Sequence, residues 1–347
     1  MNLNTDLEAM LQQIDSPAFL VQGGMITAVN QQAAARFITV QTPIGELLVT
    51  GQQEYAAFQS GSLILKISVS GTAYTCTVTC LQQDQLFTIE EDTALAELQV
   101  LSLAAQQLST PISELSLLID QLSETDKKSQ ITQNLFRLKR IIGNMSDASQ
   151  LASASSRMTS CDVCAVLEEV LEKAKTLLAE SQIKLTYQLP RQSVISMINA
   201  ELLKRAVYNL LSNAAKFSSA ADTVDVTLKH KDNKLYLTVT GGRSTIKNTA
   251  NLFHRYTREP GLESRQHGLG LGMPLIHCAA SVHGGTVLIE QTNKDLFKVT
   301  MTLSIQKSTG TDVHSPVLIP DIYGGNDQAL IELSDVLPSK FYDRNKY

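Results

Sequence analysis

The stretch from Glu201 to Phe217 reads ELLKRAVYNLLSNAAKF and decides the fold of the domain around it. Its apolar residues recur at steps of three and four, which predicts an amphipathic helix; they are Leu203, Val207, Leu210, Leu211 and Ala214. On this helix Asn209, Asn213 and Lys216 fall on one face. Amide oxygens suit a hard cation such as Mg²⁺, and a lysine suits phosphate. The helix therefore predicts one wall of a phosphate-binding pocket.

Two further segments lie downstream. Leu252–Arg258 reads LFHRYTR, and Gly268–Met273 reads GLGLGM. The alternating Gly268, Gly270 and Gly272 allow backbone N–H groups to approach a phosphate chain closely. Each segment alone is weak evidence for a nucleotide-binding pocket, but the order and spacing of the segments strengthen that evidence.

Together these segments resemble the ATP-binding domain of sensor histidine kinases. The family's N box, F box and second glycine box correspond to residues 209–218, 252–258 and 268–273. The resemblance implies an α/β-sandwich ATPase domain that binds ATP and Mg²⁺, with Asn213 as the Mg²⁺ ligand. The residues expected to contact the nucleotide are Asn209, Asn213, Lys216, Gly268, Gly270 and Gly272.

The adenine side of the pocket departs from the family pattern. The family carries an Asp-x-Gly-x-Gly segment whose carboxylate accepts a hydrogen bond from the adenine amine. Here the predicted strand Leu235–Thr240 continues into Gly241-Gly-Arg-Ser-Thr-Ile246, which places Gly241 at the carboxylate position. Arg243 and Thr245 then replace the two glycines. A lost hydrogen bond to a charged group costs about 1.5–3 kcal/mol, so we expect ATP to bind roughly ten- to a hundred-fold more weakly.

A second departure lies one helical turn before Asn209. The family carries Glu, Gln or His there, as an aid to phosphoryl transfer. This chain has Arg205, a permanent cation that cannot accept a proton. We therefore expect the transfer step to be impaired as well.

A helical hairpin is predicted before this domain. The first helix has a heptad seam of Leu98, Leu101, Ala105, Leu108, Ile112, Leu115, Ile119 and Leu122. After a polar turn at residues 123–128, a second seam follows with Leu135, Leu138, Ile142, Met145 and Ala148. Two such helices leave an apolar stripe, which a homodimeric four-helix bundle would bury. The hairpin resembles the dimerisation and phosphotransfer domain of the same family.

The phosphoacceptor of that domain is missing. Gln106-Gln-Leu-Ser-Thr-Pro111 occupies the place of the family's His-Glu-x-x-Thr-Pro box, so Gln106 replaces the histidine and Thr110 is retained. A glutamine amide is not nucleophilic at neutral pH. The six histidines are His230, His254, His267, His277, His283 and His314, so residues 1–229 contain none. No alternative register of the hairpin can supply the imidazole.

These assignments predict an α+β multidomain chain. Residues 1–90 form an α+β unit that resembles PAS sensor domains, with strands near Ala18–Val29, Ser62–Ser70, Ala73–Cys80 and Gln85–Ile89. Residues 91–157 form the hairpin, 158–306 the ATP-binding domain, and 307–347 a linker and tail. In the tail, Gly324–Leu337 resembles a short amphipathic segment stopped by Pro338. It either lies back on the ATP-binding domain or binds a partner.

Composition narrows the class of protein. The net charge of −5 gives no general basis for binding nucleic acid. No run of apolar residues is long enough to span a membrane, and the first residues lack signal-peptide features, so a cytoplasmic protein is expected. Cys161-Asp-Val-Cys164 has metal or redox spacing, but ordinary thiols in a reducing compartment are the simpler interpretation.

Three hypotheses about function follow. The first is a non-catalytic member of the histidine kinase family that binds a partner histidine kinase or a response regulator. The second is a residual enzyme that binds Mg·ATP and phosphorylates a partner chain; a variant uses Thr110 to remove phosphate from a response regulator. The third is a sensor or scaffold whose function lies in the N-terminal unit.

Overall fold

The computed structural model of the chain describes residues 3–81, 84–89, 126–149, 158–219, 222–243, 272–292, 296–306 and 327–342. It also describes the five separate positions 104, 108, 112, 115 and 119. Among the helices within these ranges, none combines the length and apolar character that crossing a bilayer requires.

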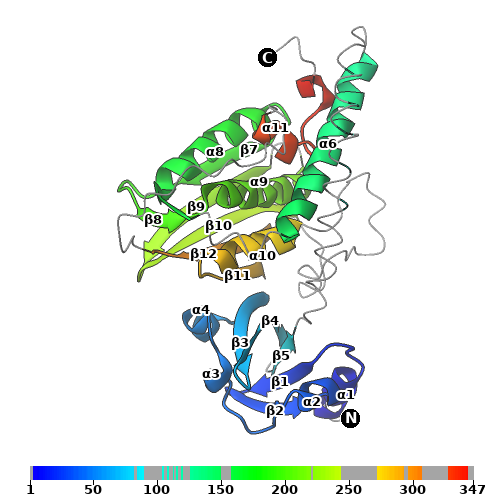
Figure 1. Cartoon of the computed structure of the whole chain (residues 1–347), viewed down its shortest axis with the longest axis vertical. Coiled ribbons are helices and arrows are strands. Elements are labelled where there is room, and N and C mark those ends of the chain that lie inside the picture. The colour runs from blue at the N-terminus through cyan, green and yellow to red at the C-terminus, as the bar shows by residue number, and fades with distance from the viewer. Residues whose placement is uncertain are drawn as a thin grey trace.

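The N-terminal unit is a five-stranded antiparallel sheet with short helices packed on it (Figure 1). Its strand order is β2-β1-β5-β4-β3, and the strands predicted from sequence are confirmed. Asn30 caps α2, since its side chain accepts a hydrogen bond from the backbone N–H of Ala33 at 2.9 Å. The elements are α1 (Leu3–Gln12), β1 (Ala18–Gln22), β2 (Met25–Val29), α2 (Gln31–Ala35), α3 (Ile44–Leu47), α4 (Gln52–Ala57), β3 (Ser62–Val69), β4 (Thr72–Leu81) and β5 (Asp84–Ile89).

The C-terminal unit places three helices on one face of a mixed sheet (Figure 1). Its strand order is β11-β12-β10-β9-β7, in which only the pair β7–β9 is parallel. A separate two-stranded ribbon, β6–β8, borders the helices. The elements are β6 (Thr159–Asp162), α8 (Val163–Ala179), β7 (Lys184–Gln188), β8 (Ile195–Ile198), α9 (Ala200–Lys216), β9 (Thr223–Lys231), β10 (Lys234–Arg243), α10 (Gly272–Val282), β11 (Val287–Gln291) and β12 (Leu296–Ser304).

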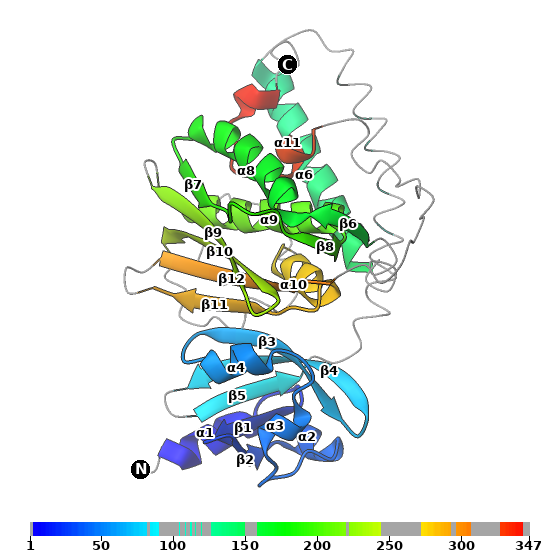
Figure 2. The same ribbon diagram turned by 90° about the vertical axis from the view of Figure 1, so that its left-hand side faces the viewer.

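The two sheets join at their edges into one ten-stranded sheet (Figure 2). Strand β3 pairs antiparallel with β11, with Ile64 opposite Val287 and Ser62 opposite Ile289. Gly61 permits this approach, because a Cβ atom there would lie 2.0 Å from the carbonyl oxygen of Ile289. Lys234 also forms an ion pair with Glu54 at 2.6 Å. Each sheet therefore protects an edge strand of the other.

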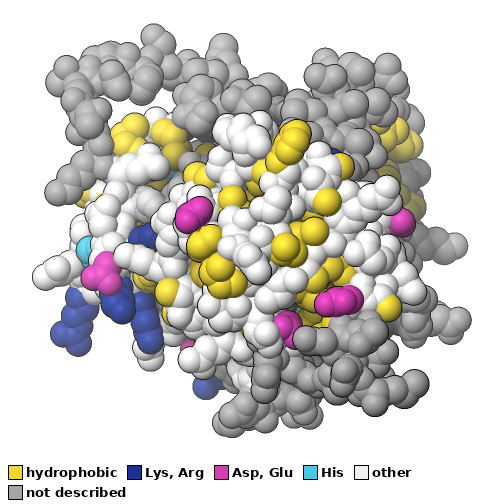
Figure 3. Space-filling model, turned by 90° about the horizontal axis from the view of Figure 1, so that it is seen from below, with side chains coloured by type: hydrophobic (Ala, Val, Ile, Leu, Met, Phe, Trp, Pro, Cys, Tyr) yellow, Lys and Arg dark blue, Asp and Glu magenta, His cyan; other side chains and the backbone are white. Residues whose placement is uncertain are grey.

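The outer face of the N-terminal unit carries few charges. Seen from below, it presents clusters of apolar side chains separated by uncharged groups (Figure 3). Phe37 is 80% exposed, and Met10 and Val40 are about half exposed. This surface fits a module that packs or associates, while the resemblance of the unit to PAS domains stays a prediction.

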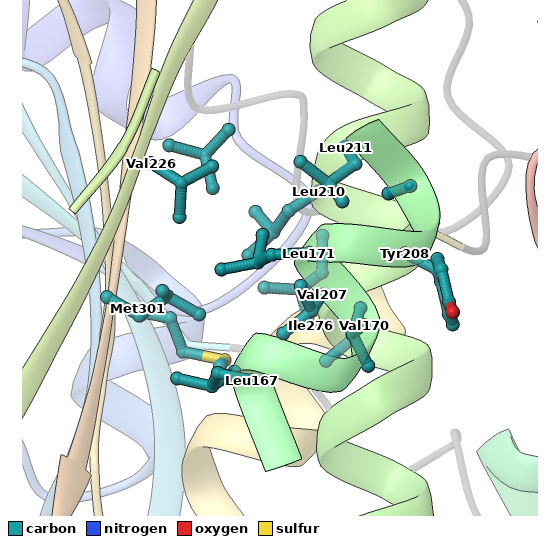
Figure 4. Packing of buried hydrophobic residues seen from close by; sticks show 14 of the residues in the cluster. Leu167, Val170, Leu171, Val207, Tyr208, Leu210, Leu211, Val226, Ile276 and Met301 are labelled. Carbon is teal, nitrogen blue, oxygen red and sulfur yellow. The ribbon is translucent and has the colours of Figure 1, made fainter. Parts of the chain in front are cut away.

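Alternation along the strands places the main core between the C-terminal sheet and its helices. Leu235, Leu237 and Val239 of β10 are buried on the helix side, while Tyr236 and Thr238 point to the other face and are only half-buried. Leu167 and Leu171 of α8 interleave with side chains of α9, α10 and the sheet (Figure 4). This packing holds α9 in a fixed position on the sheet.

Helix α6 (Asp126–Ser149) presents three faces to different surroundings. Residues 126–128, part of the stretch predicted as a polar turn, are helical. Leu135, Ile142 and Met145 are buried against Ile112 and Ile119, as the predicted seam requires. Leu138, also assigned to that seam, is instead 44% exposed. A third face, with Gln133, Arg140 and Asn144, is buried against the C-terminal unit and the tail segment, residues 327–342.

His283 connects the end of α10 to the start of α9. It is 1% exposed, its Nδ1–H donates to the carbonyl of Ala279 at 2.6 Å, and its Nε2 accepts the N–H of Asn199 at 3.0 Å. Asn199 in turn caps α9 through its side chain. Acceptance of the Asn199 N–H at Nε2 requires neutral imidazole. Burial lowers the pKa of His283 from its ordinary value of 6.5, against a smaller opposing effect of the Ala279 carbonyl.

This arrangement makes stability depend on pH. Because the folded-state pKa of His283 lies below 6.5, its contribution is complete above pH 6.5 and is lost as the pH falls toward the folded-state value. We expect the free energy of unfolding to fall below pH 6.5 by at most about 1.4 kcal/mol per pH unit from this group. Denaturant titrations of wild type and His283→Gln between pH 5.5 and 7.5 measure this. The exposed His230→Gln is the control, and parallel wild-type and His283→Gln curves would contradict the assignment.

Candidate functional site

Helix α9 carries the candidate site on the edge that faces away from the sheet. The helix runs as predicted, begins at the Asn199 cap and ends with Lys216 in its last turn. Its apolar residues pack on the sheet, which leaves Arg205, Asn209, Asn213 and Lys216 toward α6, α10 and the tail segment. The structure therefore brings these polar residues together.

Asn213 and Gly272 lie next to each other at the start of α10. A Cβ atom on Gly272 would lie 3.1 Å from Oδ1 of Asn209 and 3.7 Å from Nδ2 of Asn213. The Asn213 amide also contacts Sδ of Met273 at 3.6 Å. The predicted N box and the end of the predicted glycine box are thus in contact. Gly268, Gly270 and Leu252–Arg258 lie outside the described residues, as do Gln106 and Thr110.

Asn209 is completely buried, and protein groups occupy its amide. Its Oδ1 accepts a hydrogen bond from Nη2 of Arg140 at 3.0 Å. Its Nδ2 donates to the carbonyl of Arg205 at 3.0 Å and to Oε2 of Glu332 at 3.3 Å. Arg140 comes from α6 and Glu332 from α11 (Gln328–Glu332), the short helix of the tail segment.

Lys216 is also engaged by the tail segment. Its Nζ lies 2.6 Å from Oδ2 of Asp335, and the same carboxylate oxygen accepts a 2.6 Å bond from Nη1 of Arg140. Burial lowers the pKa of Lys216, the nearby Arg140 lowers it further, and Asp335 acts in the opposite direction. The carboxylate of Asp335 thus occupies the ammonium group of Lys216, which the sequence predicts to contact phosphate.

Arg205 ties three helices together. It is 4% exposed, donates from Nε to Oε1 of Glu332 at 3.0 Å, and donates from Nη2 to Oδ1 of Asn144 at 3.0 Å. Gly143 makes room for it, since a Cβ atom on Gly143 would lie 2.9 Å from Nη2 of Arg205. The residue at the position of the family's transfer aid is therefore a structural link between α9, α6 and α11.

The predicted adenine position is closely packed. Gly241 is buried on the helix-facing side of β10, and a Cβ atom on it would lie 3.0 Å from Cγ2 and 3.2 Å from Cα of Val224. Gly242 has φ of +72°, and a Cβ atom there would lie 2.8 Å from Cβ of Phe217. A carboxylate at 241 would need its neighbours to move, and Arg243 follows as the last residue of β10.

These residues do not fit Mg·ATP as they are arranged. Of the three α9 residues predicted to contact the nucleotide, Asn209 and Lys216 are bonded to protein groups. Gly241 offers no side chain at the adenine end. Asn213, which is half-exposed, retains the chemistry of a Mg²⁺ ligand.

The residues that complete this cluster were not predicted from sequence. They are Arg137, Arg140, Asn144, Glu332 and Asp335. One signal was available in the sequence: Glu332 and Asp335 are three residues apart in the amphipathic tail. Two residues at that spacing lie on the same side of a helical turn. Local sequence patterns do not show where that pair of acids docks.

The cysteine pair has a local structural explanation. Cys161 lies in β6, and Cys164 lies in the first turn of α8, where Asp162 caps the helix by accepting the Cys164 N–H at 3.0 Å. In the part of the chain that the structure describes, no group of three His, Cys, Asp or Glu side chains is arranged to hold a metal ion. None of the chain's five cysteines forms a disulfide in the structure.

Comparisons with known proteins agree with this architecture. Residues 198–308 match the family described as histidine kinase-, DNA gyrase B-, and HSP90-like ATPase. The adaptive-response sensory kinase SasA of Crocosphaera subtropica is 25% identical over 214 residues, which cover 55% of each chain. The heme sensor protein HssS of Staphylococcus aureus is 22% identical over 57% of this chain and 45% of its own length. The chain therefore spans about half the length of the curated relatives it matches.

Among solved structures, the histidine kinase ThkA in complex with the response regulator TrrA is 13% identical and covers 86% of this chain and 98% of its own, with a TM-score of 0.43. The ATPase family matched by residues 198–308 and the sensor kinases among the curated relatives together support a likeness of this chain to sensor histidine kinases.

Proposed function

We propose that this chain is a non-catalytic member of the sensor histidine kinase family that acts by binding, as a dimer, to a response regulator or a partner histidine kinase in the cytoplasm. The observation that carries the proposal is the absence of histidine from residues 1–229, which include the whole predicted hairpin. Without an imidazole, the hairpin cannot store a phosphoryl group at Gln106. We retain the domain limits 1–90, 91–157, 158–306 and 307–347 within this proposal, with residues 1–90 as a PAS-like sensor.

The geometry of α9 supports the proposal independently of Gln106. Arg205 is bonded to Glu332 and Asn144, so the position of the transfer aid is used for structure. Five cysteines without a disulfide also fit the reducing cytoplasm.

One observation favours a second candidate function. Asn213 and Gly272 remain in contact, as a Mg²⁺ ligand and a phosphate-binding turn would be. This supports a residual enzyme that binds Mg·ATP weakly and phosphorylates a partner chain. The remaining variant is a phosphatase that uses Thr110 to remove phosphate from a response regulator.

The first prediction from this proposal concerns autophosphorylation. Purified wild-type protein incubated with γ-labelled Mg·ATP should take no acid-labile label, and Gln106→His should also stay unlabelled because Arg205 and Gly241 are unchanged. An active sensor histidine kinase in the same assay is the positive control. Robust labelling of Gln106→His would show that the ATP-binding domain is catalytically intact, which would overturn the proposal of two independent defects.

The adenine position gives a second prediction. Gly241→Asp should lower the free energy of unfolding by about 1–3 kcal/mol, because the added side chain overpacks against Val224. It should not tighten Mg·ATP binding by itself. Adding Val224→Ala should recover part of the stability, with Val224→Ala alone as the control. Calorimetric titration and thermal unfolding measure both quantities; at least ten-fold tighter ATP binding by Gly241→Asp alone would be inconsistent with the packing seen here.

A third prediction concerns the dimer. Leu108 and Leu115 are about half exposed, and so are Ile131 and Leu138 of α6, each pair seven residues apart. We propose that these four residues form the seam between two copies. Wild type should then be a dimer by light scattering after gel filtration, and Leu138→Glu a monomer at the same concentration. Gln130→Glu, an exposed change on the same helix, should remain dimeric; a dimeric Leu138→Glu would exclude this seam.

A further inference from the structure

The tail segment and α9 make a set of contacts that no nucleotide-binding function requires. Glu332 is completely buried and receives bonds from Arg205 and Asn209, with Nε of Arg140 at 3.5 Å. Asp335 meets Lys216 and Arg140 at 2.6 Å each, and Arg137 at 3.7 Å. Two carboxylates of one segment therefore contact residues from both α6 and α9.

The cluster is rich in positive charge. Among the residues that the structure describes, the ion pairs of this cluster join four cations, Arg137, Arg140, Arg205 and Lys216, to the two carboxylates of Glu332 and Asp335. We call the four cations together with Asn209 the cationic surface. Buried cations are tolerated only when anions pair with them. The cationic surface therefore needs an anionic occupant, whichever molecule supplies it.

The tail segment is anchored by more than charge. Ile331, Leu333 and Leu337 are buried in the main core, and Tyr342 packs edge-on against Phe136 of α6. Nε2 of Gln133 donates to the carbonyls of Ser334 at 3.0 Å and Leu337 at 2.7 Å. Asp327 caps α11 and forms an ion pair with Lys173 of α8. These contacts fix the register that brings Glu332 and Asp335 onto the cationic surface.

We propose that the cationic surface is an anion-binding site whose resident ligand is the chain's own tail segment, and that the phosphate chain of a nucleotide competes with that segment for it. The inference rests on the proposed function only in treating α9 as the wall of a nucleotide-type pocket. Carboxylates and phosphates accept hydrogen bonds from the same lysine, arginine and amide donors. Because Asn209 and Lys216 cannot serve both ligands at once, nucleotide binds when the tail segment is released.

The size of the effect follows from the population of the released state. If the tail segment is released in about 1–10% of molecules, apparent nucleotide affinity falls by about ten- to a hundred-fold. Binding must also be reciprocal, so saturating nucleotide should release the tail segment by the same factor. Both consequences are measurable in the full chain.

The test uses full-length protein and two probes, Mg·ATP and tripolyphosphate. Tripolyphosphate lacks adenine, so it reports the phosphate end separately from Gly241. The variant Glu332→Gln/Asp335→Asn removes both charges with little change of shape. Ile331→Glu places a charge at a fully buried tail position and keeps both acids. Glu180→Gln, which removes the charge from the exposed ion pair with Lys340 and leaves both tail acids in place, is the control.

We expect both test variants to bind both probes about ten- to a hundred-fold more tightly than wild type or Glu180→Gln. Hydrogen exchange should show residues 327–342 released in the variants, and in wild type at saturating Mg·ATP. If neither variant binds tighter, the competition is refuted. Tighter binding by Glu332→Gln/Asp335→Asn alone would show a simple electrostatic effect. Tighter binding of Mg·ATP but not of tripolyphosphate would show that the adenine end limits the affinity. Either result overturns the inference.

Labelled ATP separates this inference from the proposed function. A released variant that binds Mg·ATP tightly and takes no label supports both. A released variant that becomes phosphorylated supports the competition and refutes the non-catalytic proposal. Variants that bind no tighter and take no label refute the competition alone.

Discussion

The pairing of Glu332 and Asp335 with Arg140, Arg205 and Lys216 is the constraint on which the arrangement of the helices depends. Glu332 is fully buried and Arg205 nearly so, and charges removed from water are stable only when opposite charges and hydrogen bonds replace it. The five side chains come from three segments, α6, α9 and the tail segment, that are distant in sequence. Satisfying the pairs fixes the three segments relative to one another, and Gly143 supplies the space in which Arg205 crosses between them.

The C-terminal unit is held on two sides. Along one edge, β11 continues into β3 of the N-terminal sheet through backbone hydrogen bonds. Across its helical layer, α6 and the tail segment are bonded to α9. Because β-pairing and close packing transmit displacement with little compliance, a change in the N-terminal unit or in the hairpin would act directly on the α9 surface.

The same residues explain both what the site lacks and what it gains. Arg205 stands where the family resemblance implies a polar or basic aid to transfer, and its guanidinium instead bonds Glu332 and Asn144. Asn209 and Lys216 keep the identities expected of a nucleotide site, yet their polar atoms meet Arg140, Glu332 and Asp335. Residue identity therefore preserved the family resemblance while the partners of those residues changed.

The sequence by itself determined the periodic elements and the chemistry that is missing. Period-two and three-to-four-residue patterns located the strands of the N-terminal unit, α9 and the apolar seam of α6, because these patterns follow from local backbone geometry. The sequence also shows that no histidine precedes residue 230. Only the tertiary structure decided that the tail segment lies back on α9, that β3 pairs with β11, and that Leu138 is exposed while Leu135 is buried. The physical reason is that edge pairing joins Ile64 to Val287, 223 positions apart along the chain, and an ion pair joins Arg140 to Asp335, 195 positions apart. No local pattern encodes such contacts.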